Sequence, residues 1–162
     1  VLMNEQSDLI EDYFEIPNKV EKIKEHVRNA DEMFWERSFI SSPMAIDEAG
    51  NRSGVKPFQL LVDDLVVFDE FMEKYISMIQ YQHKCFIQFI NNMTNDEVRT
   101  IKRKYLFKLN TYVPDELEMK IYSKCMNINK ETKEIFKDMA DMINDVSDNY
   151  RSTLNELLES LV

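Results

Sequence analysis

Apolar residues recur at intervals of three and four along most of the chain, which is the spacing of one face of an α-helix. The clearest run lies within residues 57–93, where steps of four and three alternate and only Gln82 is polar. The run consists of Leu61, Leu65, Phe68, Met72, Tyr75, Ile79, Gln82, Phe86 and Phe89. This pattern predicts one long, coiled-coil-like helix that begins after Pro57 and ends near Asn92.

A helix of this length would extend for about 50 Å at 1.5 Å per residue, which a small monomeric core does not easily cover. We therefore expect its apolar face to form the seam of a coiled-coil or helix-bundle homodimer. The predicted dimer interface consists of Leu61, Leu65, Phe68, Met72, Tyr75, Ile79 and Phe86. The alternative is a seam within one chain, formed with the apolar face of residues 18–38.

Two helices and a polar loop are predicted in residues 1–56. The first helix is expected to stop at Pro17, because proline cannot donate a backbone hydrogen bond, and Asn18 can cap the second. Trp35, beside the apolar face of the second helix, is predicted to be a core anchor. That face consists of Val20, Ile23, Val27, Ala30 and Phe34. Residues 41–57 contain both glycines and two of the four prolines, so they predict a loop.

Residues 94–145 predict a helix-turn-helix-like region. The sequence TNDE at 94–97 is a capping box that starts one helix, NTYVPD breaks it, and Pro114 starts the next. The inward faces of these two helices are predicted to be Val98, Ile101, Tyr105 and Leu109, and then Leu117, Ile121 and Cys125. The short turn NIN follows, with Asn129 as a cap, and the next apolar face begins with Ile135 and Met139. Its stripe continues through residues 146–162, which predict a C-terminal helix.

Composition supports an all-α fold class. The chain has 162 residues, of which 44% are hydrophobic, with only two glycines and four prolines. We find no signal-peptide pattern and no apolar run near the roughly 18 residues that span a membrane, so a cytoplasmic protein without a membrane partner is expected. In that reducing environment Cys85 and Cys125 are predicted to be buried free thiols.

The net charge of −10 is unevenly distributed. Residues 96–124 contain seven basic and five acidic residues, whereas residues 1–95 contain nine basic and seventeen acidic residues. Since phosphate neutralisation provides much of the affinity for nucleic acid, any DNA contact is expected to centre on the 96–124 segment and the lysines that follow it.

Enzyme chemistry is not expected, and no cofactor or metal is predicted. His26 and His83 lie far apart in sequence and outside any metal-ligand spacing. Glu70 and Glu73 form one pair of the kind that holds Mg²⁺ in all-α nucleotide pyrophosphatases, but a second pair at suitable spacing is missing. Glycines only at positions 50 and 54 exclude a phosphate-binding glycine loop.

Two segments, FIQFINNMTNDEVRTIKRKYL and YVPDELEMKIYSKCMNINKETKEIFKDMADMI, carry a family resemblance. Together with the polar loop before the long helix, they resemble the ArpU/RinA-type phage transcriptional regulators over about residues 40–145. The resemblance implies a long helix followed by a sigma-factor-like helix-turn-helix. It also implies binding to double-stranded DNA, commonly as a dimer, in the control of late or packaging genes.

On this interpretation, two groups of residues would contact DNA. Phosphates would be held by Arg99, Lys102 and Arg103. Bases and backbone would be approached by Lys130, Thr132, Lys133 and Lys137. The second half of this reading helix carries Asp138, Asp141 and Asp145, which would repel phosphate. The alternative is therefore an acidic all-α interaction protein that inhibits a nucleic-acid-handling enzyme, as a DNA mimic, anti-repressor or anti-CRISPR protein would.

Overall fold

The computed structural model describes residues 4–39 and 58–139, and within these ranges all regular structure is helical. The all-α prediction is therefore confirmed. The elements are α1 (Asn4–Phe39), α2 (Phe58–Asn91), α3 (Asn95–Ile101), the π-helix η1 (Lys102–Leu106) and α4 (Asp115–Ile135). The predicted loop at 41–57 and the predicted C-terminal helix at 146–162 lie outside the described residues.

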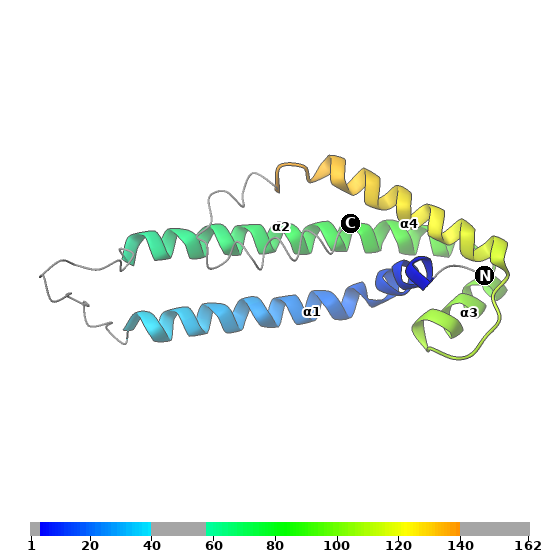
Figure 1. Cartoon of the computed structure of the whole chain (residues 1–162), viewed down its shortest axis with the longest axis horizontal. Coiled ribbons are helices and arrows are strands. Elements are labelled where there is room, and N and C mark those ends of the chain that lie inside the picture. Colours follow the sequence, from blue (N-terminus) through cyan, green and yellow to red (C-terminus); the bar gives the residue numbers. More distant parts are fainter. Residues whose placement is uncertain (1–3, 40–57, 140–162) are drawn as a thin grey trace, which may run out of the picture.

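The two long helices form an antiparallel pair, and α4 packs across both of them at one end (Figure 1). α3 and η1 lie at that same end, next to the start of α4. None of the helices in the described ranges has a segment that is both long and apolar enough to cross a bilayer.

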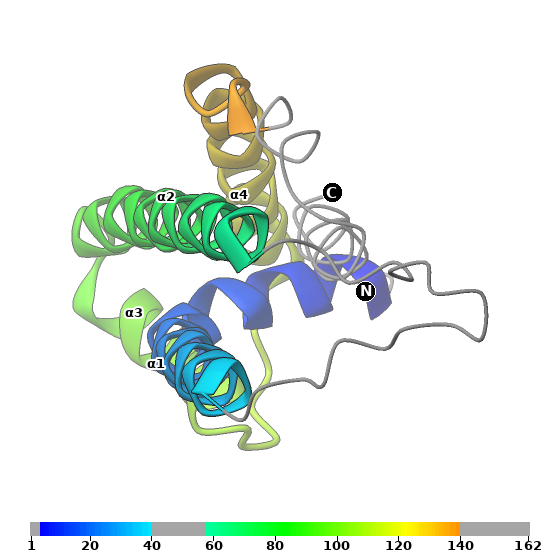
Figure 2. The same cartoon turned by 90° about the vertical axis from the view of Figure 1, so that its left-hand side faces the viewer.

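Pro17 does not end the first helix, contrary to the prediction, because α1 continues through it. Proline removes one backbone hydrogen bond, and its ring crowds the preceding turn. In a helix that is already held by packing, these two effects bend the helix and do not end it. Figure 2 shows the first turns of α1 set at an angle to the rest. Asn18 consequently lies inside the helix, and its Nδ2 donates to Glu15 Oε2 at 2.9 Å instead of capping.

The apolar face of α2 is buried within a single chain. Its buried members are Leu65, Phe68, Met72, Tyr75, Ile79, Gln82 and Phe86, while Phe89 is half-buried. Phe86 lies at the centre, with its ring 5.0 Å from Phe14 and 5.2 Å from Tyr13. Full burial of such a side chain contributes on the order of 2 kcal/mol.

This burial corrects the predicted dimer interface, whereas dimerisation itself stays a prediction. Six of the seven residues assigned to a dimer interface already pack inside the chain, against α1 and α4, so they are not available to a second copy. The side chain of the seventh, Leu61, lies outside those that the structure describes. The alternative seam with the second half of α1 is the one observed, with Val20 and Ile23 buried and Val27 and Ala30 half-buried.

The predicted turn at residues 127–129 is also wrong, because α4 runs without interruption from Asp115 to Ile135. Ile128 is fully buried and extends the inward face of Ile121 and Cys125, so the chain gains more by remaining helical there than by turning. Asn129 does not cap a helix, because its side-chain oxygen accepts hydrogen bonds from Tyr13 and Gln82. The helix-turn-helix-like region predicted at 94–145 therefore lacks its expected turn at residues 127–129.

Three further apolar predictions fail. Trp35 is 43% exposed and is not a core anchor, and Ile135 and Leu109 are more than half exposed. Met139, by contrast, is buried as predicted. Cys125 is buried and Cys85 half-buried, both as free thiols.

Candidate functional site

A cluster of large apolar side chains is exposed at the end of the molecule that holds η1. Among the described residues, ten large hydrophobic side chains are exposed. Four of these ten fall within seven consecutive positions: Leu106, Phe107, Leu109 and Tyr112. We call residues 106–112 the apolar loop. Phe107 is 63% exposed and Tyr112 is 81% exposed, which is far above the exposure such rings have in a core.

The local backbone explains why these side chains face outward. The capping box predicted at Thr94 is present, since Glu97 N donates to Thr94 Oγ1 and Thr94 N donates to Glu97 Oε2. Ile101 and Tyr105 are buried, as the helical pattern predicts. The helix then widens into η1, where Phe107 N donates to Lys102 O at 2.9 Å. A π-helical turn shifts the register of the residues that follow it, so the positions after Tyr105 leave the buried face.

Lys108 ends this turn in a left-handed conformation, with φ of 51°. Such a backbone costs a residue with a Cβ on the order of 1 kcal/mol. It reverses the chain, and Leu109 N reaches Arg103 O at 2.8 Å. Residues other than glycine, asparagine and aspartate are held in this region only where their surroundings fix them.

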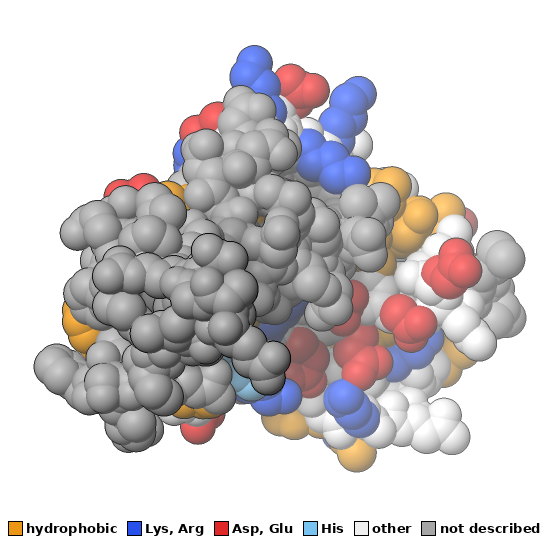
Figure 3. Space-filling model, turned by 60° about the vertical axis from the view of Figure 1, so that its left-hand side comes forward, with side chains coloured by type: hydrophobic (Ala, Val, Ile, Leu, Met, Phe, Trp, Pro, Cys, Tyr) orange, Lys and Arg blue, Asp and Glu red, His pale blue; other side chains and the backbone are white. Residues whose placement is uncertain are grey.

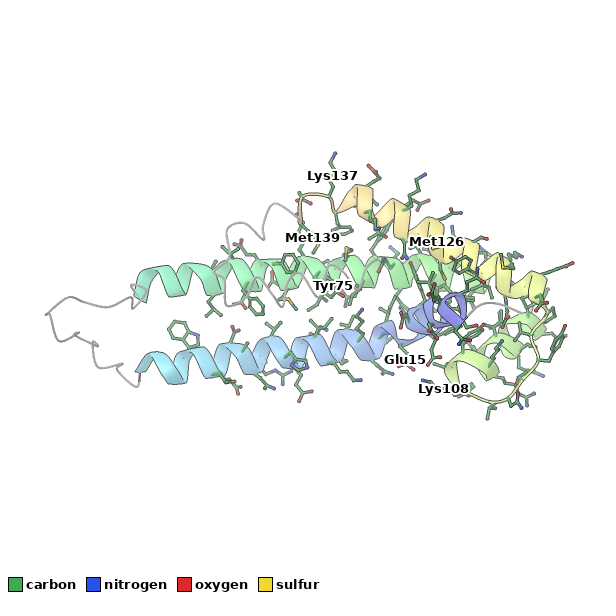
Figure 4. The ribbon with its side chains drawn as sticks, viewed as in Figure 1. Glu15, Tyr75, Lys108, Met126, Lys137 and Met139 are labelled. Carbon is green, nitrogen blue, oxygen red and sulfur yellow. The ribbon has the colours of Figure 1, made fainter. Side chains whose placement is uncertain are left out.

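Those surroundings include two carboxylates on α1. Lys108 Nζ lies 2.5 Å from Glu11 Oε1 and 3.8 Å from Glu15 Oε1. Figure 4 shows Lys108 and Glu15 facing each other between η1 and α1. The hydrogen bond with Glu11 and the charges of Glu11 and Glu15 raise the pKa of Lys108, although burial opposes the rise. These contacts are exposed, so they orient the loop more than they stabilise it.

A buried contact anchors the other side of the loop. Tyr105 OH donates to Glu118 Oε1 at 2.7 Å, and Lys104 Nζ forms an ion pair with the same oxygen. Only 3% of the Glu118 side chain is exposed. Burial, followed by the hydrogen bond to Glu118, raises the pKa of Tyr105. Because Glu118 lies in the first turns of α4, this network ties the base of the apolar loop to the rest of the bundle.

The residues predicted to bind DNA fall into two separate groups. Arg99 and Arg103 are exposed and Lys102 is half-exposed, at the end of the molecule where α4 begins. The lysines predicted to approach DNA bases lie at or just beyond the far end of α4, a helix of 21 residues and therefore about 30 Å long. These lysines are Lys130, Lys133 and Lys137, and all are exposed. The two groups of basic residues therefore do not form one continuous basic surface.

Thr132 is wrongly assigned to the DNA contact. It is buried, and its Oγ1 donates to Ile128 O at 2.6 Å within α4. Glu131 and Glu134 are exposed among the lysines. Asp138 forms an ion pair with Lys74 of α2, and this hydrogen bond lowers the pKa of Asp138. Figure 3 shows basic and acidic side chains intermixed at the top of the molecule, where α4 ends.

Among the residues that the structure describes, no group of three or more His, Cys, Asp or Glu side chains is arranged to hold a metal ion. His26 is exposed. His83 is half-buried, and burial lowers its pKa.

Sequence reasoning missed the apolar loop because it treated NTYVPD only as a helix breaker. The signal was present: Tyr105, Leu106, Phe107 and Leu109 are more apolar residues than one helical face can bury. No protein-family model matches the chain, and neither does any curated protein or solved structure. The resemblance to the ArpU/RinA-type regulators stays a prediction.

Proposed function

We propose that this chain is a helical protein-interaction module that binds a partner protein through the apolar loop. The observation that carries this proposal is the concentration of four exposed apolar side chains on one anchored segment. Exposed apolar clusters on a folded domain mark interaction surfaces, because leaving them in water has no structural benefit. Aromatic side chains and arginine also provide most of the energy at protein interfaces, and Arg103 is exposed four positions before Phe107.

The anchors support the same proposal. Lys104, Tyr105 and Glu118 fix the base of the loop, and Lys108 bonds to α1, so the backbone that carries Phe107 is held in place before binding. A preorganised segment loses less conformational entropy when a partner docks. The partner's complementary surface would be an apolar groove that receives the exposed rings.

Site-specific photo-cross-linking tests the proposal. A benzophenone amino acid replaces Phe107 or Tyr112 in the cell that produces the protein, and the matched control replaces Met33. Met33 is also exposed and apolar, but it lies near the C-terminal end of α1. We expect a discrete protein adduct from positions 107 and 112 and none from 33. Equal adducts at all three positions, or adducts with nucleic acid alone, would contradict the proposal.

The narrower form of this proposal is that the partner is a nucleic-acid-handling enzyme. The net charge of −10 favours this form, because an acidic protein can approach a surface built to bind phosphate. It predicts that the cross-linked partner is such an enzyme and that the purified chain inhibits it. The inhibition should weaken as salt is raised, since screening reduces attraction between exposed charges.

A DNA-binding transcriptional regulator is the second candidate. The observation that favours it is that Lys130, Lys133 and Lys137 are exposed and form no ion pair with a described residue. Binding to duplex DNA is measured at low and moderate salt for the wild type and for Lys133→Glu with Lys137→Glu. This candidate requires affinity that falls steeply with salt and is lost in the double variant. Absence of binding at low salt rejects it.

A further inference from the structure

A cleft of about 490 Å³ opens where the first turns of α1 meet α2 and α4. It lies on different parts of α1 and α4 from those that anchor the apolar loop, and Met126 of α4 lines it (Figure 4). Cavities of 300–1,000 Å³ are the size that holds small molecules or a partner's side chain.

The floor of the cleft is polar and only partly satisfied. Asn129 Oδ1 accepts one hydrogen bond from Tyr13 OH at 2.5 Å and another from Gln82 Nε2 at 3.2 Å. Gln82 lines the cleft and is only 6% exposed. Its carbonyl oxygen Oε1 makes no hydrogen bond to any described residue, and it is not one of the described buried side-chain atoms that lack a partner, so solvent in the cleft reaches it. The cleft therefore presents an available hydrogen-bond acceptor at its base.

The rim is negatively charged. Glu5, Asp8 and Asp12 line the cleft, against a single basic residue, Lys19. Partial burial raises the pKa of Asp12, and neighbouring carboxylates add to the rise, although Lys19 opposes it. A bound positive charge would remove this repulsion. The walls between rim and floor are partly apolar, with Leu9, Ile79 and Met126.

We propose that this cleft binds an organic cation that carries N–H donors on a short apolar chain, such as a guanidinium or primary ammonium group. The N–H donors satisfy Gln82 Oε1, the positive charge lies among Asp8 and Asp12, and the methylene chain packs on Met126. The cation has two sources, a free amine or an arginine or lysine side chain of a protein. This site is independent of the apolar loop and of the proposed function that rests on it.

Calorimetric titration of the full chain tests this inference, with agmatine as the free cation and N-acetyl-Gly-Arg-Gly-amide as the protein side chain. Butan-1-ol is the neutral control. We expect saturable binding of at least one cation and none of the alcohol. Tighter binding of the peptide would identify a protein side chain as the source, and tighter binding of agmatine would identify a free amine. Failure of both cations to bind saturably overturns the proposal.

Variants locate the binding in the cleft. Asp8→Asn with Asp12→Asn should weaken binding about tenfold or more, since hydrogen bonds to charged groups are the strong ones. Glu25→Gln, on the exposed part of the same helix, should leave affinity unchanged. Gln82→Met keeps the side-chain length and removes the acceptor, so it should also weaken binding, with circular dichroism as the check on folding. Unchanged affinity in the Asp8 and Asp12 variant would assign the binding to another surface and overturn the proposal.

Discussion

Removal of the positive charge next to Glu118 should destabilise the whole base of the apolar loop. In Lys104→Met, the Glu118 carboxylate keeps its bond from Tyr105 but loses its only described ion-pair partner. Breaking a fully buried ion pair by removing one partner costs about 3–5 kcal/mol. Lys104 is 34% exposed, so solvent reaches the pair, and we reduce this cost to about 2 kcal/mol. Urea denaturation at pH 7 measures the loss.

The variants at Lys104 and Glu118 should also differ from one another in their free energy of unfolding. Glu118→Gln retains an acceptor for Tyr105 and leaves the Lys104 charge able to reach solvent, so it should cost about 1 kcal/mol. The double variant leaves no unpaired charge and should be more stable than Lys104→Met alone. Lys102→Met, in the same turn of η1 and without a described ion pair, is the matched control and should cost less than about 0.5 kcal/mol. Equal losses for the two lysine variants would refute the reasoning.

Three further predictions concern local structure. Lys108→Gly should be about 1 kcal/mol more stable than Lys108→Ala by urea denaturation, because both lose the ion pairs and only glycine tolerates the left-handed backbone; equal stability would contradict this. Burial and Asp31 raise the pKa of Asp69 to about 6. Because the folded state favours the protonated carboxyl, this group stabilises the fold below pH 4, and the contribution is lost as pH rises through 6. Asp69→Asn should therefore raise stability at pH 7 by about 1 kcal/mol and flatten the decline between pH 4 and 7 that we expect of the wild type. Thr94→Ala should cost about 1 kcal/mol in thermal unfolding through loss of the capping box, whereas Thr94→Ser should cost much less.

Periodicity predicted the long helices well because helical burial follows from local spacing. It did not predict what each face packs against. An alternating four-and-three pattern is compatible with a partner helix from another chain or from the same chain, and here α1 folds back to cover α2. The choice depends on the geometry of the whole chain and not on the pattern around Tyr75.

Helix ends were harder to predict for the same reason. Pro17 and the NIN sequence are local signals for a break, but tertiary contacts override both. Ile16 and Val20 are buried on either side of Pro17, and Ile128 is buried within NIN. Burial of a large aliphatic side chain contributes more than the modest preference of an asparagine for a cap.

The candidate site was only partly predictable. The exposure of Arg99 and Arg103 follows from their place opposite the apolar positions of one helix. The outward turn of Phe107 depends on a π-helical register shift, and the anchor between Lys104 and Glu118 joins residues fourteen positions apart through the fold. The excess of apolar residues in this segment indicates that some of them are exposed, but which ones are exposed, and the ion pair with Glu118, depend on the fold.

The central claim is that the apolar loop is the binding surface of this protein. The most direct test is the affinity of the purified cross-linked partner for the wild type and for Phe107→Ser with Leu109→Ser. Ile135→Ser is the matched control, because Ile135 is also exposed and apolar but lies at the other end of α4. We predict a loss of about a hundredfold or more in the double variant and little change in the control. Equal affinity in the wild type and the double variant would contradict the claim.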